Sequence, residues 1–247
     1  EKISDNPLTV KYTINPKATW SDGNPIDCDD AVLFWAANSN KYLTGKKDSE
    51  GLPIPMFSSS GTIGYENMNR PQCKDGDKEF TVQYTKTFAD WAAMFDTSIP
   101  AHIVERESGV PDILAAIDNN DRTALKKAGK FYSYGWNLKK GELKPEIMPS
   151  SGPYQFSSWQ AGESLTLTAN PKWWGSPPKA STIVIRIVKD NQQAQALQNG
   201  EIQVMNPQPN PELLQQLEAI GSSIKVTTHD EYTYEHFDFN MRKKSPF

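Results

Sequence analysis

Residues 8–37 read LTVKYTINPKATWSDGNPIDCDDAVLFWAA, and this stretch decides the fold because it contains a strand, a turn and the start of a helix. Apolar residues alternate with threonine and lysine from Leu8 to Ile14, a spacing that predicts a half-buried strand. Pro16 ends the strand, and Trp20-Ser21-Asp22-Gly23 predicts a tight turn.

The helix that follows begins near Asp27. This aspartate is placed to cap the apolar run of residues 31–37, with Asp30 three positions later as an imperfect capping box. Asp27, Asp29 and Asp30 could in principle coordinate a metal ion. Their position at a helix start favours capping and compensation of the helix dipole, so no metal site is predicted.

The rest of the chain mixes strands and helices. Strands are predicted at residues 80–84, 165–167, 183–187, 224–228 and 232–240. Helices are predicted at residues 88–95, 112–128, 191–200 and 211–220. Residues 44–70 are rich in Gly, Ser and Pro, a composition that predicts mostly loop. Residues 135–151 predict a crossing segment between subdomains 1–148 and 149–247. This order favours an α/β or mixed α+β class.

Bulk composition excludes some classes of protein. The chain has 247 residues, of which 26 are basic and 30 acidic, giving a net charge of -4. It also has 7 Trp, 9 Tyr and 10 Phe, more aromatic residues than a disordered chain carries. The charge balance gives no reason to expect nucleic acid as a partner, because nucleic-acid binding requires a basic face. No apolar run is long enough to span a bilayer.

Two cysteines, Cys28 and Cys73, leave two interpretations open. They could be buried thiols. They could instead form a disulfide across 45 positions, which would stabilise the fold by about 4 kcal/mol and would place the protein outside the cytoplasm. The histidines, at positions 102, 229 and 236, have no ligand spacing to the cysteines that would predict a zinc site.

Motifs for enzymatic chemistry are missing from the sequence. Ser58-Ser59-Ser60-Gly61 lacks the spacing of a nucleophile elbow, and neither a zinc-protease motif nor a glycine-rich phosphate loop occurs. The tryptophans support one competing hypothesis, a secreted carbohydrate-binding or carbohydrate-active protein. Burial of Trp20, Trp173 and Trp174 would remove the main support for that hypothesis.

Five stretches in order are similar to one family, the family 5 extracellular solute-binding proteins of peptide, dipeptide and nickel ABC importers. They are NPKATWSDGNPIDCDD (15–30), FADWAAMFDTSIPAHIVE (88–105), SGPYQFSSWQAGESLTLTANPKWWG (151–175), ALQNGEIQV (196–204) and YEHFDFNMRKKSPF (234–247). The sequence departs from the family pattern at Gln203, where Asp is usual, and at Cys28, where a small residue is usual. A second unusual cysteine at position 73 favours the disulfide.

The resemblance implies an α/β (mixed α+β) lobe of the periplasmic-binding-protein type II class. Family members are longer and form a clamp of two lobes, so the chain is expected to be a trimmed lobe I that lacks the second lobe. Residues 1–148 are then its N-terminal subdomain, and residues 149–247 its sheet-containing subdomain.

The function implied is capture of oligopeptides or dipeptides outside the membrane and delivery to an ABC permease, without catalysis. A nickel complex or an oligosaccharide stays open as the ligand. The resemblance also implies a monomeric, extracytoplasmic protein, periplasmic or a cell-surface lipoprotein, with no cofactor. An extended peptide can bind like a guest strand through its backbone. The candidate ligand contacts are Tyr232, Tyr234, His236, Phe57 and Ser59.

Overall fold

The computed structural model describes residues 1–96, 99–208, 210–228 and 236–241. The chain divides into two compact units, residues 1–186 and residues 187–247, and each unit has its own hydrophobic core. The sequence also predicts a boundary between residues 148 and 149, which would separate two subdomains of one lobe. That boundary stays a prediction. Across the described ranges, no helix has both the length and the apolar character needed to cross a bilayer.

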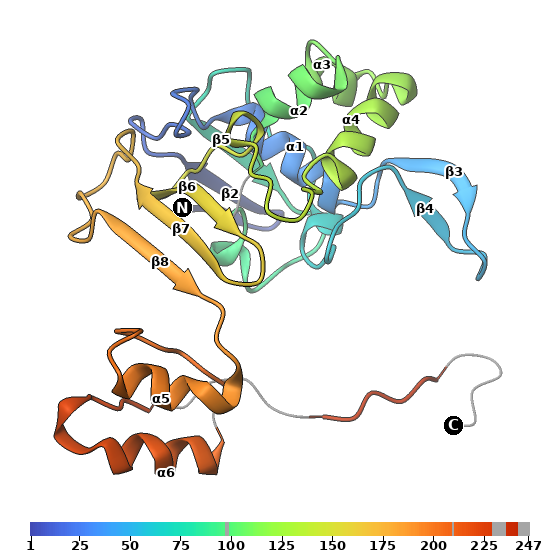
Figure 1. Cartoon of the computed structure of the whole chain (residues 1–247). Helices are drawn as coiled ribbons and strands as arrows, with labels where there is room; N and C mark the ends of the chain where they lie inside the picture. The colour runs from blue at the N-terminus through green and yellow to red at the C-terminus, as the bar shows by residue number, and fades with distance from the viewer. Residues whose placement is uncertain (97–98, 209, 229–235, 242–247) are drawn as a thin grey trace. The chain divides into compact units, whose positions relative to one another are not determined.

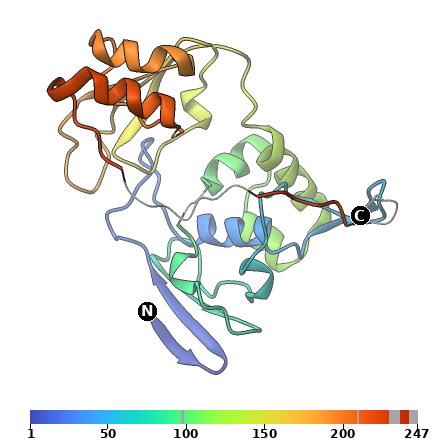
Figure 2. The same ribbon diagram turned by 90° about the horizontal axis from the view of Figure 1, so that it is seen from below.

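The first sheet of the first unit contains three antiparallel strands. They are β1 (Lys2–Asp5), β2 (Leu8–Thr13) and β5 (Glu79–Gln83), in the order β1-β2-β5. Strands β1 and β2 form a hairpin that carries the N-terminus (Figure 2). Val10 lies opposite Val82 and both side chains are fully buried, as the alternation in the sequence predicts.

Helix α1 (Cys28–Asn38) is buried on most of its surface, because nine of its 11 residues are buried. The backbone N–H of Asp27 donates to the Asp30 carboxylate over 3.1 Å, which is the reach-back contact of a capping box. The predicted strand and helix of residues 8–37 are therefore confirmed.

Three further helices, α2 (Ala101–Ser108), α3 (Ile113–Asp118) and α4 (Arg122–Tyr134), pack with α1 in one cluster (Figure 1). The prediction of one helix over residues 112–128 is wrong. Asn120 adopts a left-handed φ of 49°, which ends one helix, and the Asp121 side chain caps the next by accepting the N–H groups of Thr123 and Ala124.

A second sequence prediction in this unit is also wrong, because the helix predicted at residues 88–95 is only a single 3₁₀ turn, η2 (Trp91–Ala93). Residues 44–70, predicted to be mostly loop, are mostly without regular structure. This segment also contains the antiparallel strands β3 (Leu43–Lys47) and β4 (Pro53–Pro55) and the 3₁₀ turn η1 (Tyr65–Asn67).

A second three-stranded antiparallel sheet ends the first unit. After the 3₁₀ turn η3 (Pro145–Ile147), it contains β6 (Tyr154–Gln160), β7 (Ser164–Ala169) and β8 (Thr182–Arg186), in that order. Leu165 of β7 lies opposite Ile185 of β8, so both predicted strands are confirmed.

Two short helices lie in the described residues of the second unit. They are α5 (Gln193–Gln198), preceded by the 3₁₀ turn η4 (Asp190–Gln192), and α6 (Pro211–Ile220), followed by η5 (Gly221–Ser223). The Asn210 side chain caps α6 by accepting the N–H of Leu213 over 2.8 Å. Residues 224–228 do not form the predicted strand. The strand predicted at 232–240 lies partly outside the described residues, and residues 236–240 have no regular structure.

Gly129 of α4 packs directly on the backbone of Met56, and an added Cβ would overlap the Met56 carbonyl oxygen. In an exposed helix, alanine would be favoured over glycine by about 1 kcal/mol. Here we expect Gly129→Ala to lower the free energy of unfolding by about 2 kcal/mol, since overpacking forces the backbone to move. Urea denaturation followed by circular dichroism measures the change.

The matched control is Gly152→Ala, because a Cβ at Gly152 would meet no atom within 4 Å. We expect that variant to stay within about 0.5 kcal/mol of the wild type. A Gly129→Ala protein as stable as the wild type would show that α4 and Met56 are not in close contact.

Candidate ligand-binding site

The binding candidates near the C-terminal end belong to the second unit. Tyr232 and Tyr234 lie outside the described residues. His236 is exposed, and its Nε2 lies 3.3 Å from the Asp238 carboxylate. The roles of these three residues in ligand binding stay predictions.

The other two candidates lie in the first unit. The Phe57 side chain is 1% exposed and packs edge-on against Tyr132, with ring centroids 5.4 Å apart. Ser59 is exposed. Phe57 therefore contributes to the core of this structure, while Ser59 is accessible to solvent, and a contact of either residue with ligand stays a prediction.

A hollow of about 160 Å³ opens in the first unit beside β2, β5 and the start of α1. Its lining residues are Tyr12, Thr13, Ile14, Ile26, Asp27, Ala31, Phe80 and Phe95. Sites for whole small molecules usually measure about 300–1,000 Å³. The hollow is therefore large enough for one side chain or end group of a ligand.

Aromatic rings form one wall of this hollow. Tyr12 stacks on Phe80 with centroids 5.2 Å apart, and Phe95 meets both rings edge-on at 5.0 and 4.9 Å. The Tyr12 hydroxyl donates to the Trp91 carbonyl over 2.7 Å and lies 2.9 Å from the Tyr84 hydroxyl. Burial, aided by this contact with Tyr84, raises the pKa of Tyr12 far above its ordinary value, so the phenol stays neutral.

Phe95 also has an unusual backbone conformation, with φ at 60°. A bulky side chain in the left-handed region costs on the order of 1–3 kcal/mol and persists only when the surroundings hold it in place. The Phe95 N–H donates to the Tyr65 hydroxyl over 2.9 Å, and its ring packs in the aromatic wall. These contacts fix the conformation that places Phe95 at the hollow.

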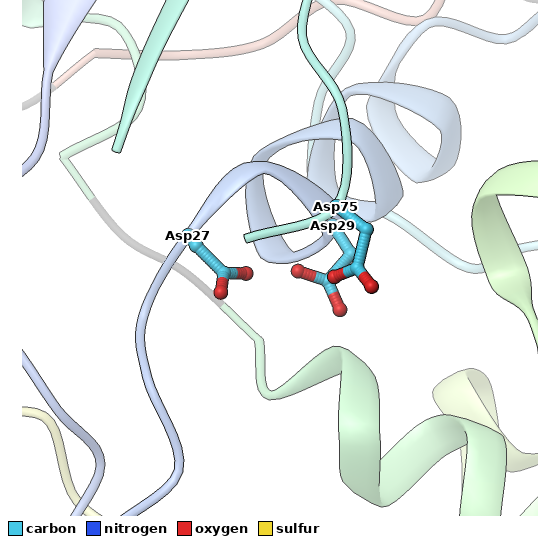
Figure 3. A group of neighbouring side chains, drawn as sticks. All are labelled: Asp27, Asp29 and Asp75. Carbon is cyan, nitrogen blue, oxygen red and sulfur yellow. The ribbon is translucent and has the colours of Figure 1, made fainter. Parts of the chain in front are cut away.

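The carboxyl group at the hollow belongs to Asp27, a residue that is 4% exposed. Figure 3 shows the carboxyl groups of Asp27, Asp29 and Asp75 gathered near the start of α1, and their closest oxygens lie within 4.8 Å of one another. Burial raises the pKa of Asp27 to about 8, and the hydrogen bond and negative charge of Asp29 add to the effect.

This acidic cluster offers three oxygen ligands. A Ca²⁺ ion takes 6–8 oxygen ligands, so the cluster alone is not a complete site. A cationic side chain also lies close by, because the Lys78 ammonium donates to the Ile26 carbonyl over 2.6 Å. Its positive charge offsets a small part of the rise in the pKa of Asp27. Two features explain the cluster. Carboxylates are favoured at the N-terminus of a helix, where Asp27 and Asp29 lie, and the disulfide between Cys28 and Cys73 brings Asp75 close to them.

Asp27 gives the fold a predicted pH dependence. Its pKa rises on folding from 3.8 to about 8, so the folded state binds a proton that the unfolded state releases between these values. The stability that this proton contributes is therefore full below about pH 4 and is lost as the pH rises through about 8. We expect the Asp27→Asn variant to lose less stability than the wild type across this range.

Melting temperatures of both proteins at several pH values between about 4 and 8 measure the effect. The difference between the two profiles isolates Asp27 from Asp30 and Glu105, whose pKa values are also raised, each to about 7, mainly by burial. Parallel profiles for the two proteins would show that Asp27 is ionised in the fold.

The side chains that line the hollow at Asp27 are suited to binding part of a ligand. Among the described residues that line the hollow, Asp27 supplies the carboxyl group, and none is a histidine or a cysteine. The hollow can hold an apolar group against rings and bind one polar group at Asp27.

The tryptophans give mixed support to the carbohydrate hypothesis. Trp20 is 3% exposed, and its Nε1 donates to Asp30, so it belongs to the core. Trp173 is half-buried, and Trp174 is 39% exposed. Their rings are tilted by 44° with centroids 4.7 Å apart, so the pair does not present the flat platform that sugar stacking needs.

Comparison with known proteins assigns a family. The family described as "Bacterial extracellular solute-binding proteins, family 5 Middle" matches residues 1–247. An uncharacterized lipoprotein of Mycobacterium tuberculosis is 28% identical over 238 residues, covering 93% of this chain and 38% of the lipoprotein. The oligopeptide-binding protein OppA of the same species is 29% identical over 197 residues, covering 79% of this chain and 27% of OppA.

The structure supports the same assignment. The periplasmic EDTA-binding protein EppA superposes with a TM-score of 0.66 at 26% identity, over 89% of this chain and 35% of EppA. The chain thus spans well under half of the length of each of these proteins. The predicted α/β (mixed α+β) class, with a periplasmic-binding-protein type II lobe, is confirmed. The chain belongs to the bacterial extracellular solute-binding proteins of family 5.

Proposed function

We propose that these residues form one lobe of the substrate-binding component of an ABC importer, which captures oligopeptides or dipeptides outside the membrane. The observation that carries the proposal is the family match along residues 1–247. The similarity to an oligopeptide-binding protein over 79% of the chain favours peptides over other solutes.

The proposed mechanism is closure of a two-lobed clamp. Residues 1–148 and 149–247 are the two subdomains of this lobe, and a second lobe closes over the ligand. The ligand favours the closed form only by binding it more tightly than the open form. The closed form then docks on the permease.

The ligand is held through its backbone, as a guest strand would be, with Tyr232, Tyr234, His236, Phe57 and Ser59 as candidate contacts. The protein makes and breaks no bonds, needs no cofactor and acts as a monomer. Its place is outside the cytoplasm, in the periplasm or at the cell surface, in keeping with the lipoprotein among its relatives.

Calorimetry with defined peptides of two to nine residues tests this proposal. We expect the full-length gene product that contains these residues to bind at least one peptide with micromolar affinity. We expect the 247-residue chain alone to bind the same peptides weakly or not at all, because one lobe cannot supply the difference between open and closed states. Micromolar binding to the 247-residue chain would refute the clamp, and failure of the full-length protein to bind any peptide would refute the ligand class.

A further inference from the structure

A second and larger hollow lies in the first unit, between the β3–β4 hairpin and α4. Its volume is about 640 Å³, which falls within the usual range of sites for small molecules. It is lined by Thr44, Met56, Arg122, Thr123, Lys126, Lys127 and Lys130. The hollow is distinct from the small one at Asp27, since the two share no lining residue.

Its lining is strongly cationic. Four of the seven lining residues are Arg or Lys and none is Asp or Glu, although the chain as a whole has a net charge of -4. Arg122, Lys126 and Lys130 follow one another at intervals of four residues, so they share one face of α4. Like charges at this spacing on a helix repel one another and destabilise it.

The cations are not neutralised within the described part of the chain. Arg70, which does not line the hollow, makes a two-pronged ion pair with Asp118 at 2.7 and 2.9 Å. In the parts of the chain that the structure describes, Lys126, Lys127 and Lys130 make no such ion pair. The Arg122 guanidinium is instead positioned by donating from Nη2 to the Leu43 carbonyl over 3.0 Å.

The opposite side of α4 holds this face in a fixed place. Leu125 and Ala128 are fully buried, and Gly129 lies against the Met56 backbone. Thr44 links the two strands of the hairpin, because its hydroxyl donates to the Ile54 carbonyl over 2.9 Å. The cationic face of α4 is therefore one side of the hollow, and Thr44 of the hairpin and Met56 line the other side.

We propose that this hollow is a binding site for a small polyanion that carries two or more carboxylate or phosphoryl groups. Such a ligand would relieve the repulsion among the four cations, and the planar guanidinium of Arg122 suits two-point contact with either group. The hollow is open and its four cations are exposed, so a dissolved anion can reach all of them. The site does not depend on the proposed peptide function, because it uses none of the candidate peptide contacts.

Calorimetry of the 247-residue chain with inorganic tripolyphosphate, at low ionic strength and near neutral pH, tests the proposal. We expect saturable binding at one site, and binding about tenfold weaker in the double variant Lys126→Gln, Lys130→Gln, because the charge-assisted contacts are lost. The matched control is Lys139→Gln, Lys140→Gln, which removes the same charge from exposed positions that do not line the hollow. We expect the control to change the affinity by about twofold or less.

Three results would overturn the proposal. The first is that tripolyphosphate shows no saturable binding. The second is an equal loss in the two double variants, which would indicate only general attraction to the chain. The third is binding to phosphatidylglycerol vesicles that depends on Lys126 and Lys130 while tripolyphosphate does not bind, which would assign this face to a membrane surface.

Discussion

Replacing Cys28 and Cys73 together with alanine is expected to lower the free energy of unfolding by about 4 kcal/mol, the loop-entropy estimate for a 45-residue separation. The bond joins the first residue of α1 to the segment before β5, and Cys28 is fully buried. Without the cross-link, the unfolded chain gains freedom while the folded state keeps its other contacts. Urea denaturation of both proteins measures the loss.

Reduction provides the control for this experiment. A reducing agent should destabilise the wild type by a similar amount and should leave the Cys28→Ala, Cys73→Ala protein unchanged. A loss of less than about 1 kcal/mol in the double variant would contradict the expectation, since native disulfides in extracellular domains typically contribute about 2–5 kcal/mol.

The second large effect is expected at Asp30, which is 2% exposed. One carboxylate oxygen accepts the N–H of Ala101 over 2.7 Å, and the other accepts Trp20 Nε1–H and the Asp27 N–H, each over 3.1 Å. Asp30 thus connects the turn at Trp20 with the starts of α1 and α2. We expect Asp30→Ala to lower the free energy of unfolding by about 3–5 kcal/mol, because three buried donors lose their acceptor.

The matched control for Asp30 is Asp90→Ala, which removes the same carboxylate from an exposed position. We expect that variant to stay within about 0.5 kcal/mol of the wild type in the same denaturation experiment. If Asp30→Ala were as stable as Asp90→Ala, the carboxylate would not be the link among these three segments.

Local patterns in the sequence predicted the elements whose signals are contained within a few residues. Strand β2 has strict alternation, α1 has Asp27 and Asp30 at its start, and α6 has Pro211 at its first position. Each of these signals depends on neighbours in the chain, so tertiary packing did not change the outcome.

The errors arose where a short signal was overlooked or where distant residues decide the conformation. Asn120 and Asp121 interrupt an apolar pattern that otherwise continues, and the capping signal at Asp121 would have divided the helix. The left-handed backbone of Phe95 depends on packing against Tyr12 and Phe80, which come from two strands. No local pattern encodes that contact.

The sequence predicted the disulfide, because its two cysteines were unusual for the family. The same pairing could have indicated the acidic cluster, since Asp27 and Asp29 flank Cys28 and Asp75 lies two residues after Cys73. The cationic hollow could not be predicted in this way. The sequence shows Arg122, Lys126 and Lys130 at intervals of four, which places them on one face of a helix. The hairpin on the other side of the hollow lies in a region whose composition predicted mostly loop.

Native mass spectrometry of the full-length gene product incubated with a defined oligopeptide tests the central claim most directly. A solute-capturing clamp should give a complex of one protein with one peptide, and the peptide should be recovered at its original mass after long incubation. Recovery of cleaved or otherwise altered peptide would contradict the claim that this protein binds its solute and leaves it unchanged.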